Sequence, residues 1–288
     1  MSQHRAIGQP RRRRSLATVG LGSVVGKGTG TTDYPSTEHF DIVVTDRVIE
    51  EPWVVSKVRP GERLLDVGSA TSRYLRDLAT GCRVCAIDLR STRAQPDVTV
   101  LRGDLNCAPF RPGSFDVITC ISTIEHVGLD IYDQGPDEFG DEVAMRHIRR
   151  LLRPGGRLLL TAPFGRAVVS AWHRVYNQAG FRHLIGGYRL LSLEYYRLEG
   201  NHYVPCQRDE TSDASFDFPN MRSGGLVLAE LTPADGLAFL LARLSLRIRR
   251  TWRQLTHRGP FWVDRWSGES AAVWLRRQRD MLSKRASR

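Results

Sequence analysis

Two hydrophobic spacings alternate along residues 63–231, which predicts strands and helices in turn. Short apolar runs with turn residues on both sides are followed by longer segments in which apolar residues recur every three or four positions. Because strands that alternate with helices favour a parallel sheet covered on both faces, we expect an α/β, Rossmann-like, seven-stranded, mostly parallel sheet. The expected strands are 63–67, 83–87, 98–101, 115–121, 157–161, 188–198 and 225–231, and the expected helices are 72–79, 137–152 and 172–184.

The two ends of the chain depart from this pattern. Residues 1–33 are rich in Arg, Gly, Ser and Thr and have little periodicity, which is typical of a disordered basic arm. The apolar positions of residues 40–58 indicate a helix, interrupted at Pro52, that leads into the fold. Residues 232–288 interleave leucines with arginines and are expected to form a basic, partly helical C-terminal extension. The domain itself is therefore expected over residues 34–231.

The positive charge is concentrated in these two ends. The net charge is +11, but residues 1–30 carry six Lys/Arg and no acid, and residues 241–288 carry thirteen Lys/Arg against three acids. The remaining 31–240 segment is mildly acidic at −5, which weakens the case for a domain that reads nucleic acid. The basic extension would suit an anionic membrane surface as an interfacial helix. The spread of its apolar positions around the helix favours packing on the domain instead.

Cysteine usage and hydropathy indicate a cytoplasmic protein, with the membrane surface as a second location if the basic extension binds lipid. No run of eighteen apolar residues predicts a transmembrane helix. The five cysteines are irregularly spaced, unlike a disulfide framework. Cys82 and Cys85 have zinc-site spacing, but no second pair follows, so buried thiols and no metal are expected.

Acidic and small residues follow the first two expected strands in an arrangement typical of nucleoside binding. Asp66 ends the first strand and is followed by Gly68, where a missing side chain lets the backbone approach a ligand closely. Asp66 can accept hydrogen bonds or order the loop. Asp88 ends the second strand, where a carboxylate can take both hydroxyl groups of a ribose.

Five segments in the expected order resemble the class I S-adenosylmethionine-dependent methyltransferases, of the methyltransferase-domain 11-like type. They are motif I at 64–68, the acidic second-strand motif at 86–88, the adenine segment at 102–105, motif IV and its loop at 114–127, and the turn before the fifth strand at 151–158. The resemblance implies S-adenosyl-L-methionine as the cofactor. It places at the cofactor Asp66, Gly68, Ser69, Ala70, Asp88, Leu89, Asp104, Leu105 and Ser122.

The first turn departs from the family pattern, because Ala70 and Ser72 stand where further glycines are usual. An NAD-dependent enzyme is the nearest rival on fold grounds. Such an enzyme needs the fuller glycine pattern to bind a pyrophosphate, and this loop lacks that pattern. The methyl donor has no phosphates, so the loss of glycines affects it less.

The loop after the fourth strand holds a titratable pair, Glu125 and His126, at the end of the sheet where catalysis is expected. His126 could take a proton from a hydroxyl acceptor while Glu125 orients it or contacts the donor. Alternatively, Glu125 caps the next helix and His126 only packs in the loop. The expected substrate-binding residues are Tyr132, Trp172, His202 and Tyr203, although the 199–206 loop containing the last two could equally be stabilised by its own side chains.

Three functions remain open from the sequence. The first is a methyltransferase that acts on oxygen or nitrogen of a small metabolite or saccharide. The second is an RNA methyltransferase that uses the basic ends as phosphate clamps, which the acidic middle of the chain makes the weaker case. The third is a module that binds S-adenosylmethionine without turnover.

Overall fold

The computed structural model describes residues 45–90, 94–129, 131, 136–170, 172–217, 222–234, 244 and 248. The basic arm predicted at 1–33 and nearly all of the predicted extension beyond residue 234 lie outside the described residues, as does Tyr132. Along the described parts of the chain, no helix is both long and apolar enough to cross a membrane.

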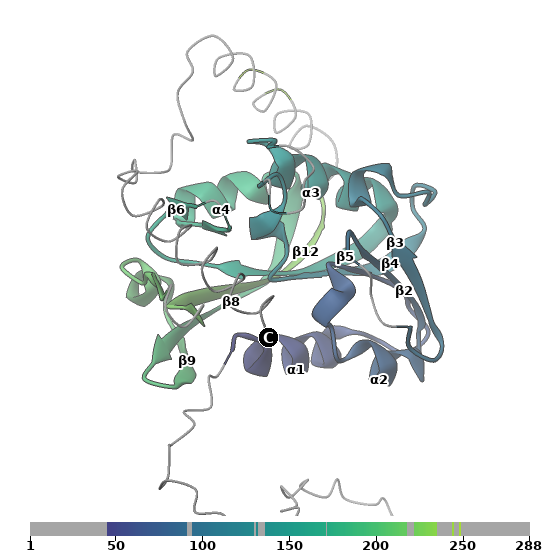
Figure 1. Cartoon of the computed structure of the whole chain (residues 1–288), viewed down its shortest axis with the longest axis horizontal. Coiled ribbons are helices and arrows are strands. Elements are labelled where there is room, and N and C mark those ends of the chain that lie inside the picture. Colours follow the sequence, from purple (N-terminus) through teal and green to yellow (C-terminus); the bar gives the residue numbers. More distant parts are fainter. Residues whose placement is uncertain are drawn as a thin grey trace, which may run out of the picture. The chain divides into compact units, whose positions relative to one another are not determined.

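An eight-stranded sheet in the order β3-β2-β1-β4-β5-β12-β8-β9 forms the centre of the described fold (Figure 1). The first five strands in this order are parallel to one another, and each later pairing is antiparallel. The structure therefore confirms the α/β, Rossmann-like, mostly parallel class. The strands are β1 (Arg63–Val67), β2 (Arg83–Asp88), β3 (Val98–Arg102), β4 (Phe115–Ile121), β5 (Leu152–Pro163), β8 (Tyr188–Glu199), β9 (His202–Cys206) and β12 (Gly225–Pro233).

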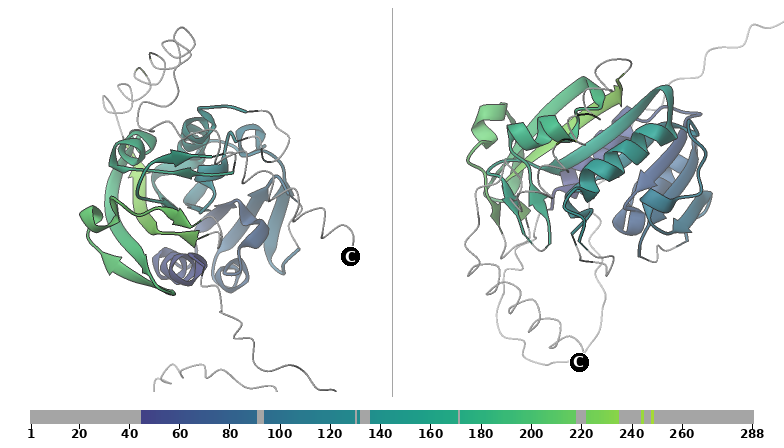
Figure 2. Two further views of the ribbon diagram at one scale, coloured as in Figure 1. Left: turned by 60° about the vertical axis from the view of Figure 1, so that its left-hand side comes forward. Right: turned by 90° about the horizontal axis from the view of Figure 1, so that it is seen from above.

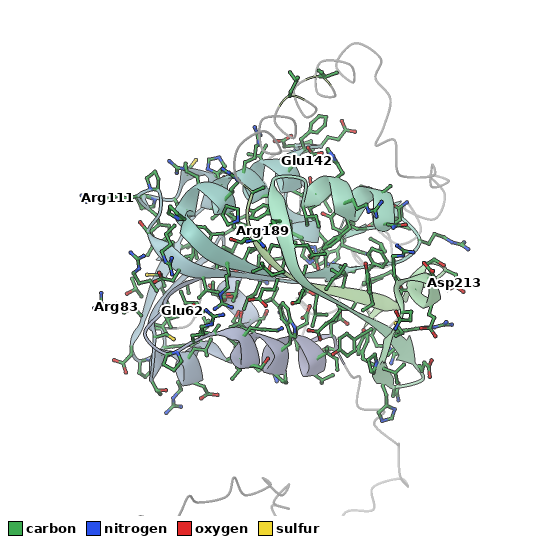
Figure 3. All side chains as sticks on the ribbon, turned by 180° about the vertical axis from the view of Figure 1, so that it is seen from behind. Glu62, Arg83, Arg111, Glu142, Arg189 and Asp213 are labelled. Atoms are coloured by element: carbon green, nitrogen blue, oxygen red, sulfur yellow. The ribbon has the colours of Figure 1, made fainter. Side chains whose placement is uncertain are left out.

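Helices cover both faces of the sheet (Figure 1 and Figure 2). α1 (Arg47–Lys57) and α2 (Leu75–Ala79) lie on one face, and α3 (Gly140–Leu151) and α4 (Gln178–Leu184) lie on the other. Successive strand residues point to opposite faces, so Leu64 joins the core under α1 and α2, whereas Leu65 joins the core under α3. Charged side chains such as Arg83, Arg111 and Asp213 project at the periphery (Figure 3).

Several short elements complete the described fold. Four 3-10 turns are η1 (Ser69–Thr71), η2 (Leu105–Cys107), η3 (Ile124–His126) and η4 (Arg208–Thr211). Two small hairpins pair β6 (Val168–Val169) with β7 (Arg174–Val175), and β10 (Phe216–Asp217) with β11 (Arg222–Ser223).

The predicted interruption at Pro52 is wrong, because α1 continues through this residue. A proline inside a helix removes one backbone hydrogen bond, at a cost of about 3 kcal/mol. The carbonyl that loses its partner belongs to Val48, which is half exposed to solvent. On the opposite side, Trp53 and Val54 are buried against the sheet, so tertiary packing holds the helix together.

The predicted helix over 172–184 is wrong in its first half. Arg174 and Val175 form β7 instead, and α4 begins only at Gln178. Asn177 accounts for this boundary, because its side chain accepts a hydrogen bond from the Gly180 backbone N–H at 2.9 Å and caps the helix.

The central sheet of the described residues contains eight strands, one more than the seven predicted. β9 occupies part of the segment that we expected to be a pocket loop, and it pairs with β8 from Glu199↔His202 to Tyr195↔Cys206. Gly200 has a φ of +57°, which glycine adopts readily. A two-residue turn between the strands is therefore available, and the chain folds back as a hairpin.

Candidate active site

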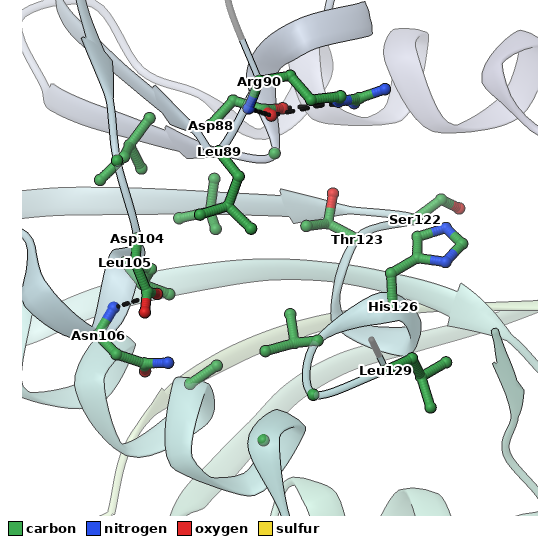
Figure 4. Close-up of a pocket in the computed structure, with 18 of the residues that line it drawn as sticks. Asp88, Leu89, Arg90, Asp104, Leu105, Asn106, Ser122, Thr123, His126 and Leu129 are labelled. Carbon is green, nitrogen blue, oxygen red and sulfur yellow. Dashed lines mark hydrogen bonds and ion pairs between the residues drawn. The ribbon is translucent and has the colours of Figure 1, made fainter. Parts of the chain in front are cut away.

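A cavity of about 430 Å³ opens where β1, β2, β3 and β4 end (Figure 4). This is the size of an ordinary small-molecule pocket, and the carboxyl ends of parallel strands are where such sites form. Eight of the predicted site residues lie in its wall, namely Gly68, Asp88, Leu89, Asp104, Leu105, Ser122, His126 and Trp172. Asp66, Ser69, Ala70, Glu125, His202 and Tyr203 do not belong to that wall.

Gly68 lets the turn after β1 approach the loop after β4. Its φ is +83°, in the left-handed region, and a Cβ added there would lie 2.2 Å from Oγ1 of Thr123. Gly68 is thus required by its backbone conformation and also by its neighbour. Thr123 itself lies in the cavity wall, so this contact joins two sides of the site.

Asp66 lies beneath the turn rather than in the cavity. Its buried carboxylate accepts hydrogen bonds from the hydroxyls of Ser72 at 2.6 Å, Tyr74 at 2.5 Å and Thr119 at 2.6 Å. Burial raises the pKa of Asp66, and these hydroxyls oppose that rise. Of the two roles left open by the sequence, the geometry favours ordering the loop. Ser72, which departs from the family pattern, supplies one of these bonds.

Asp88 connects the turn after β1 to the end of β2. One carboxylate oxygen accepts the Ala70 N–H at 2.8 Å, and the other accepts the Arg90 N–H at 2.8 Å. The Arg90 guanidinium also lies 3.3 Å from Asp88. Ala70 therefore contributes through its backbone, while the carboxylate of Asp88 stays in the cavity wall.

A polar corner follows β3. Asp104 accepts the Asn106 N–H at 2.9 Å and so begins η2. The side-chain Oδ1 of Asn106 is buried and has no hydrogen-bond partner among the residues that the structure describes. Asn106 also lies in the cavity wall, and an unsatisfied buried polar atom is uncommon in a folded protein. Asn106 was not predicted from the sequence, although its place directly after Asp104-Leu105 was an available signal.

Ser122 is held in a strained backbone conformation by two hydrogen bonds. Its φ is +39°, which is unusual for a residue other than glycine. Its N–H donates to Thr161 Oγ1 at 2.9 Å, and its hydroxyl donates to Glu50 Oε1 at 2.5 Å. Because this single hydroxyl hydrogen is used by Glu50, the oxygen of Ser122 can only accept from a ligand.

Glu50 and Arg47, neither of which was predicted from the sequence, bring α1 into the site. Glu50 is fully buried, and burial raises its pKa to about 7. Arg47 lies 3.4 Å from Glu50 and donates to the Ile121 carbonyl and the Thr71 hydroxyl, each at 3.2 Å. Arg47 also lies in the cavity wall. No motif identified them, because α1 precedes every segment that resembles the family.

His126 has its proton position fixed by a backbone carbonyl. Its Nδ1 lies 2.6 Å from the Trp172 oxygen, and a carbonyl can only accept, so Nδ1 carries the hydrogen. Burial lowers the pKa of His126, which favours the neutral ring near pH 7. The neutral ring then presents Nε2 as a proton acceptor. The Trp172 ring packs edge-on at a centroid distance of 5.7 Å.

The side chain of Glu125 is buried close to His126. Its Oε1 lies 3.9 Å from His126 Nε2, which is too long for a hydrogen bond. Burial raises the pKa of Glu125 well above its usual value and so favours the uncharged acid. Glu125 lies within η3, so it does not cap α3.

Two predicted substrate residues, His202 and Tyr203, lie in β9 at the far edge of the sheet and outside the cavity wall. The Tyr203 hydroxyl lies 2.8 Å from the Ser223 carbonyl and also bonds Asp46. One hydroxyl hydrogen cannot serve both. Burial raises the pKa of Asp46, so a proton on Asp46 with Tyr203 donating to Ser223 satisfies each group. The contacts of Tyr203 therefore lie within the fold and indicate a structural role.

Comparison with known proteins finds similarity to methyltransferases over part of the chain. A family model described as "Methyltransferase domain" matches residues 65–160. Demethylmenaquinone methyltransferase of Beutenbergia cavernae is 31% identical over 109 residues, covering 35% of this chain and 41% of that protein. Ubiquinone biosynthesis O-methyltransferase of Xanthomonas campestris pv. campestris is 34% identical over 139 residues, covering 41% of this chain and 53% of that protein. The chain thus matches about half, or less, of the length of these relatives.

The solved structures that match this chain do so at low sequence identity. The N-methyltransferase NodS from Bradyrhizobium japonicum WM9, in complex with S-adenosyl-L-homocysteine, matches with a TM-score of 0.48 and 14% identity. That match covers 68% of this chain and 90% of the other.

Proposed function

We propose that this chain, which carries a class I S-adenosylmethionine-dependent methyltransferase domain, transfers a methyl group to oxygen or nitrogen of a small molecule bound beside His126. The observation that supports this most is the placement of His126. The Trp172 carbonyl holds the proton on Nδ1 at 2.6 Å, so Nε2 is the basic nitrogen of a ring whose residue shares one cavity wall with Asp88 and Asp104. A proton acceptor beside a nucleoside-type site is what methylation of a hydroxyl requires.

The residues of the cavity fit S-adenosylmethionine, the cofactor of this family. Asp88 would accept hydrogen bonds from the ribose hydroxyls, which are donors that suit a carboxylate. Asp104 would accept a hydrogen bond from the adenine amino group. Ser122, whose oxygen can only accept, would meet the ammonium group, and Arg47 would meet the carboxylate. When bound, the donor supplies an electrophilic methyl group on a positively charged sulfur.

The protein's own contribution is to position the acceptor and to receive its proton. His126 Nε2 would take the proton that the acceptor hydroxyl gives up when it is methylated. Because the pKa of His126 is lowered, this ring is ready to accept near neutral pH. Glu125, in its uncharged form, adds no negative charge that would raise the pKa of His126 again.

For the acceptor we propose a small aromatic hydroxyl compound. Trp172 is partly exposed and lies in the cavity wall, and its ring would offer an apolar surface against which such a compound could pack. The names of two relatives, a demethylmenaquinone methyltransferase and a ubiquinone biosynthesis O-methyltransferase, point in the same direction. A saccharide acceptor would pack on the same wall and is the alternative. The RNA hypothesis depends on basic segments that lie outside the described residues, so we do not propose it.

The test is methyl transfer from radiolabelled S-adenosylmethionine to caffeic acid and, in parallel, to methyl glucoside. Wild type is expected to label caffeic acid. His126→Ala should reduce turnover by about 100-fold or more while S-adenosylhomocysteine affinity stays within about twofold, because general-base catalysis contributes on this scale. His202→Ala, a histidine outside the cavity wall, is the matched control and should retain full turnover.

Three results would contradict this proposal. Unchanged turnover in His126→Ala would remove His126 from the reaction. Labelling of methyl glucoside alone would replace the aromatic acceptor with a saccharide. Tight S-adenosylhomocysteine binding with no labelled product from either acceptor would favour a binding module without turnover.

A further inference from the structure

The turn between β6 and β7 lies directly against His126. Trp172, in this turn, provides the carbonyl that meets His126 Nδ1 and the ring that packs edge-on against the imidazole. No sequence motif signals this backbone contact. The orientation of one backbone carbonyl therefore decides which nitrogen of His126 carries the hydrogen.

Ser170 fixes the direction of that carbonyl. Its hydroxyl oxygen accepts the N–H of Trp172 at 3.1 Å and the N–H of His173 at 3.0 Å. The Ser170 N–H also donates to the His173 carbonyl at 3.0 Å, which closes the turn. Ser170 and His173 are buried, so solvent does not compete for these bonds.

Arg174 anchors the other side of His126. Its buried guanidinium donates from Nη1 to the Val127 carbonyl at 2.6 Å, with the Glu125 carbonyl at 3.4 Å. These are the residues directly before and after His126. The same guanidinium lies 3.7 Å from Asp141 in the first turn of α3. A charged donor bonded to two carbonyls holds the backbone of this loop more firmly than a neutral donor would.

We infer that Ser170 and Arg174 are positioning residues for His126, which together keep its hydrogen on Nδ1 and aim Nε2 into the cavity. Arg174 fixes the His126 backbone from one side, and the Ser170 turn presents the Trp172 carbonyl from the other. The inference rests on the proposed function, since only a base needs a defined tautomer. A histidine in water without this carbonyl favours hydrogen on Nε2, which would present a donor to the acceptor hydroxyl.

The test is direct observation of the His126 ring by NMR. Long-range ¹H–¹⁵N spectra of the full chain, labelled with ¹⁵N-histidine, distinguish the two tautomers, and His126→Gln assigns the signals. Wild type is expected to show the Nδ1–H form near pH 7. Ser170→Ala and Arg174→Gln should each lower the ratio of Nδ1–H to Nε2–H by about tenfold, the worth of one good hydrogen bond. Ser170→Thr keeps the hydroxyl and should keep the wild-type ratio.

Arg157→Gln is the matched control. Arg157 is also a buried arginine in ion pairs, with Glu62 and Glu230, but it lies in the middle of β5, where it pairs with Val117 near the beginning of β4. This variant should lose stability and leave the His126 spectrum unchanged. If Arg174→Gln does not fold, the two Ser170 variants decide the question.

Two outcomes would overturn the inference: Nε2–H as the wild-type form, or wild-type tautomer ratios in both Ser170→Ala and Arg174→Gln. Neither measurement uses an acceptor, so this failure is distinguishable from failure of the proposed function. The latter would appear as unchanged turnover in His126→Ala, whatever the tautomer.

Discussion

Two glycines can be used to test how closely the turn after β1 packs against the loop after β4. Gly68 and Gly61 have nearly the same left-handed φ, +83° and +85°. A Cβ added at Gly61 would meet nothing within 4 Å, whereas a Cβ at Gly68 would meet Thr123 Oγ1 at 2.2 Å and Cγ2 at 2.5 Å. Alanine at Gly61 therefore tests the backbone conformation alone. Alanine at Gly68 tests the conformation and the contact together.

The expected magnitudes follow from this difference. Placing a side chain in the left-handed region costs about 1–2 kcal/mol, so both variants should lose at least this much unfolding free energy. At Gly68 the contact falls 1.2 Å short of the 3.4 Å at which ordinary packing begins, so Thr123 must move. Overpacking of this kind costs a further 1–3 kcal/mol or so. Because Thr123 lies in the cavity wall, donor affinity should fall as well.

The assay is thermal denaturation together with calorimetric titration of S-adenosylhomocysteine, on both variants and wild type. Gly61→Ala should lower Tm by a few degrees at about 2–4 °C per kcal/mol and keep wild-type affinity. Gly68→Ala should lower Tm further and weaken binding by about tenfold or more. Equal Tm and equal affinity in the two variants would refute the idea that the turn and the β4 loop define one site.

Three further predictions concern groups around the site. Burial raises the pKa of Glu50 from 4.5 to about 7, so its ionisation reduces the free energy of unfolding by about 3 kcal/mol as pH rises from 4.5 to 7. Glu50→Gln should therefore reduce the drop in Tm between pH 5 and pH 8. An unchanged drop would contradict the raised pKa of Glu50. Tyr203→Phe should cost about 1–2 kcal/mol in urea denaturation and leave S-adenosylhomocysteine affinity intact, whereas lost affinity would restore Tyr203 to the ligand site. Arg63 and Arg153 hold the pKa of Asp116 well below its usual range. Asp116→Asn should therefore destabilise the protein by about 1 kcal/mol at pH 7 and by progressively less as pH falls below 4. A loss of stability that does not depend on pH would contradict this prediction.

The class of fold could be predicted from the sequence because each buried strand has its own short run of apolar residues. The run Leu64-Leu65 is apolar on both faces, as a strand between two helical layers requires. The hairpin of β8 and β9 was missed because its signal is a single Gly200 in a polar stretch. The helix boundary at Asn177 was missed because the apolar spacing continues back to Trp172 and masks the capping signal of the asparagine.

The site was predictable where it follows strand ends. Gly68, Asp88, Asp104 and His126 lie at the end of a strand or within five residues after it, and they line one cavity, as expected at the carboxyl ends of parallel strands. Arg47 could not be placed from sequence, because its contacts with Thr71 and Ile121 span 24 and 74 residues. Long-range polar contacts of this kind leave no periodic signal along the chain.

Binding of the methyl donor in the cavity at the ends of β1 to β4 underlies every functional step proposed above. Calorimetric titration of the full chain with S-adenosylhomocysteine, which is the donor without its methyl group, tests this binding site most directly. We expect binding of one molecule per chain, weakened about 10- to 100-fold by Asp88→Ala, since a hydrogen bond to a charged group contributes on this scale. Asp77→Ala, which removes an exposed carboxylate on α2, should bind like wild type. Absence of binding to wild type, or equal affinity in Asp88→Ala and wild type, would show that this cavity is not the donor site.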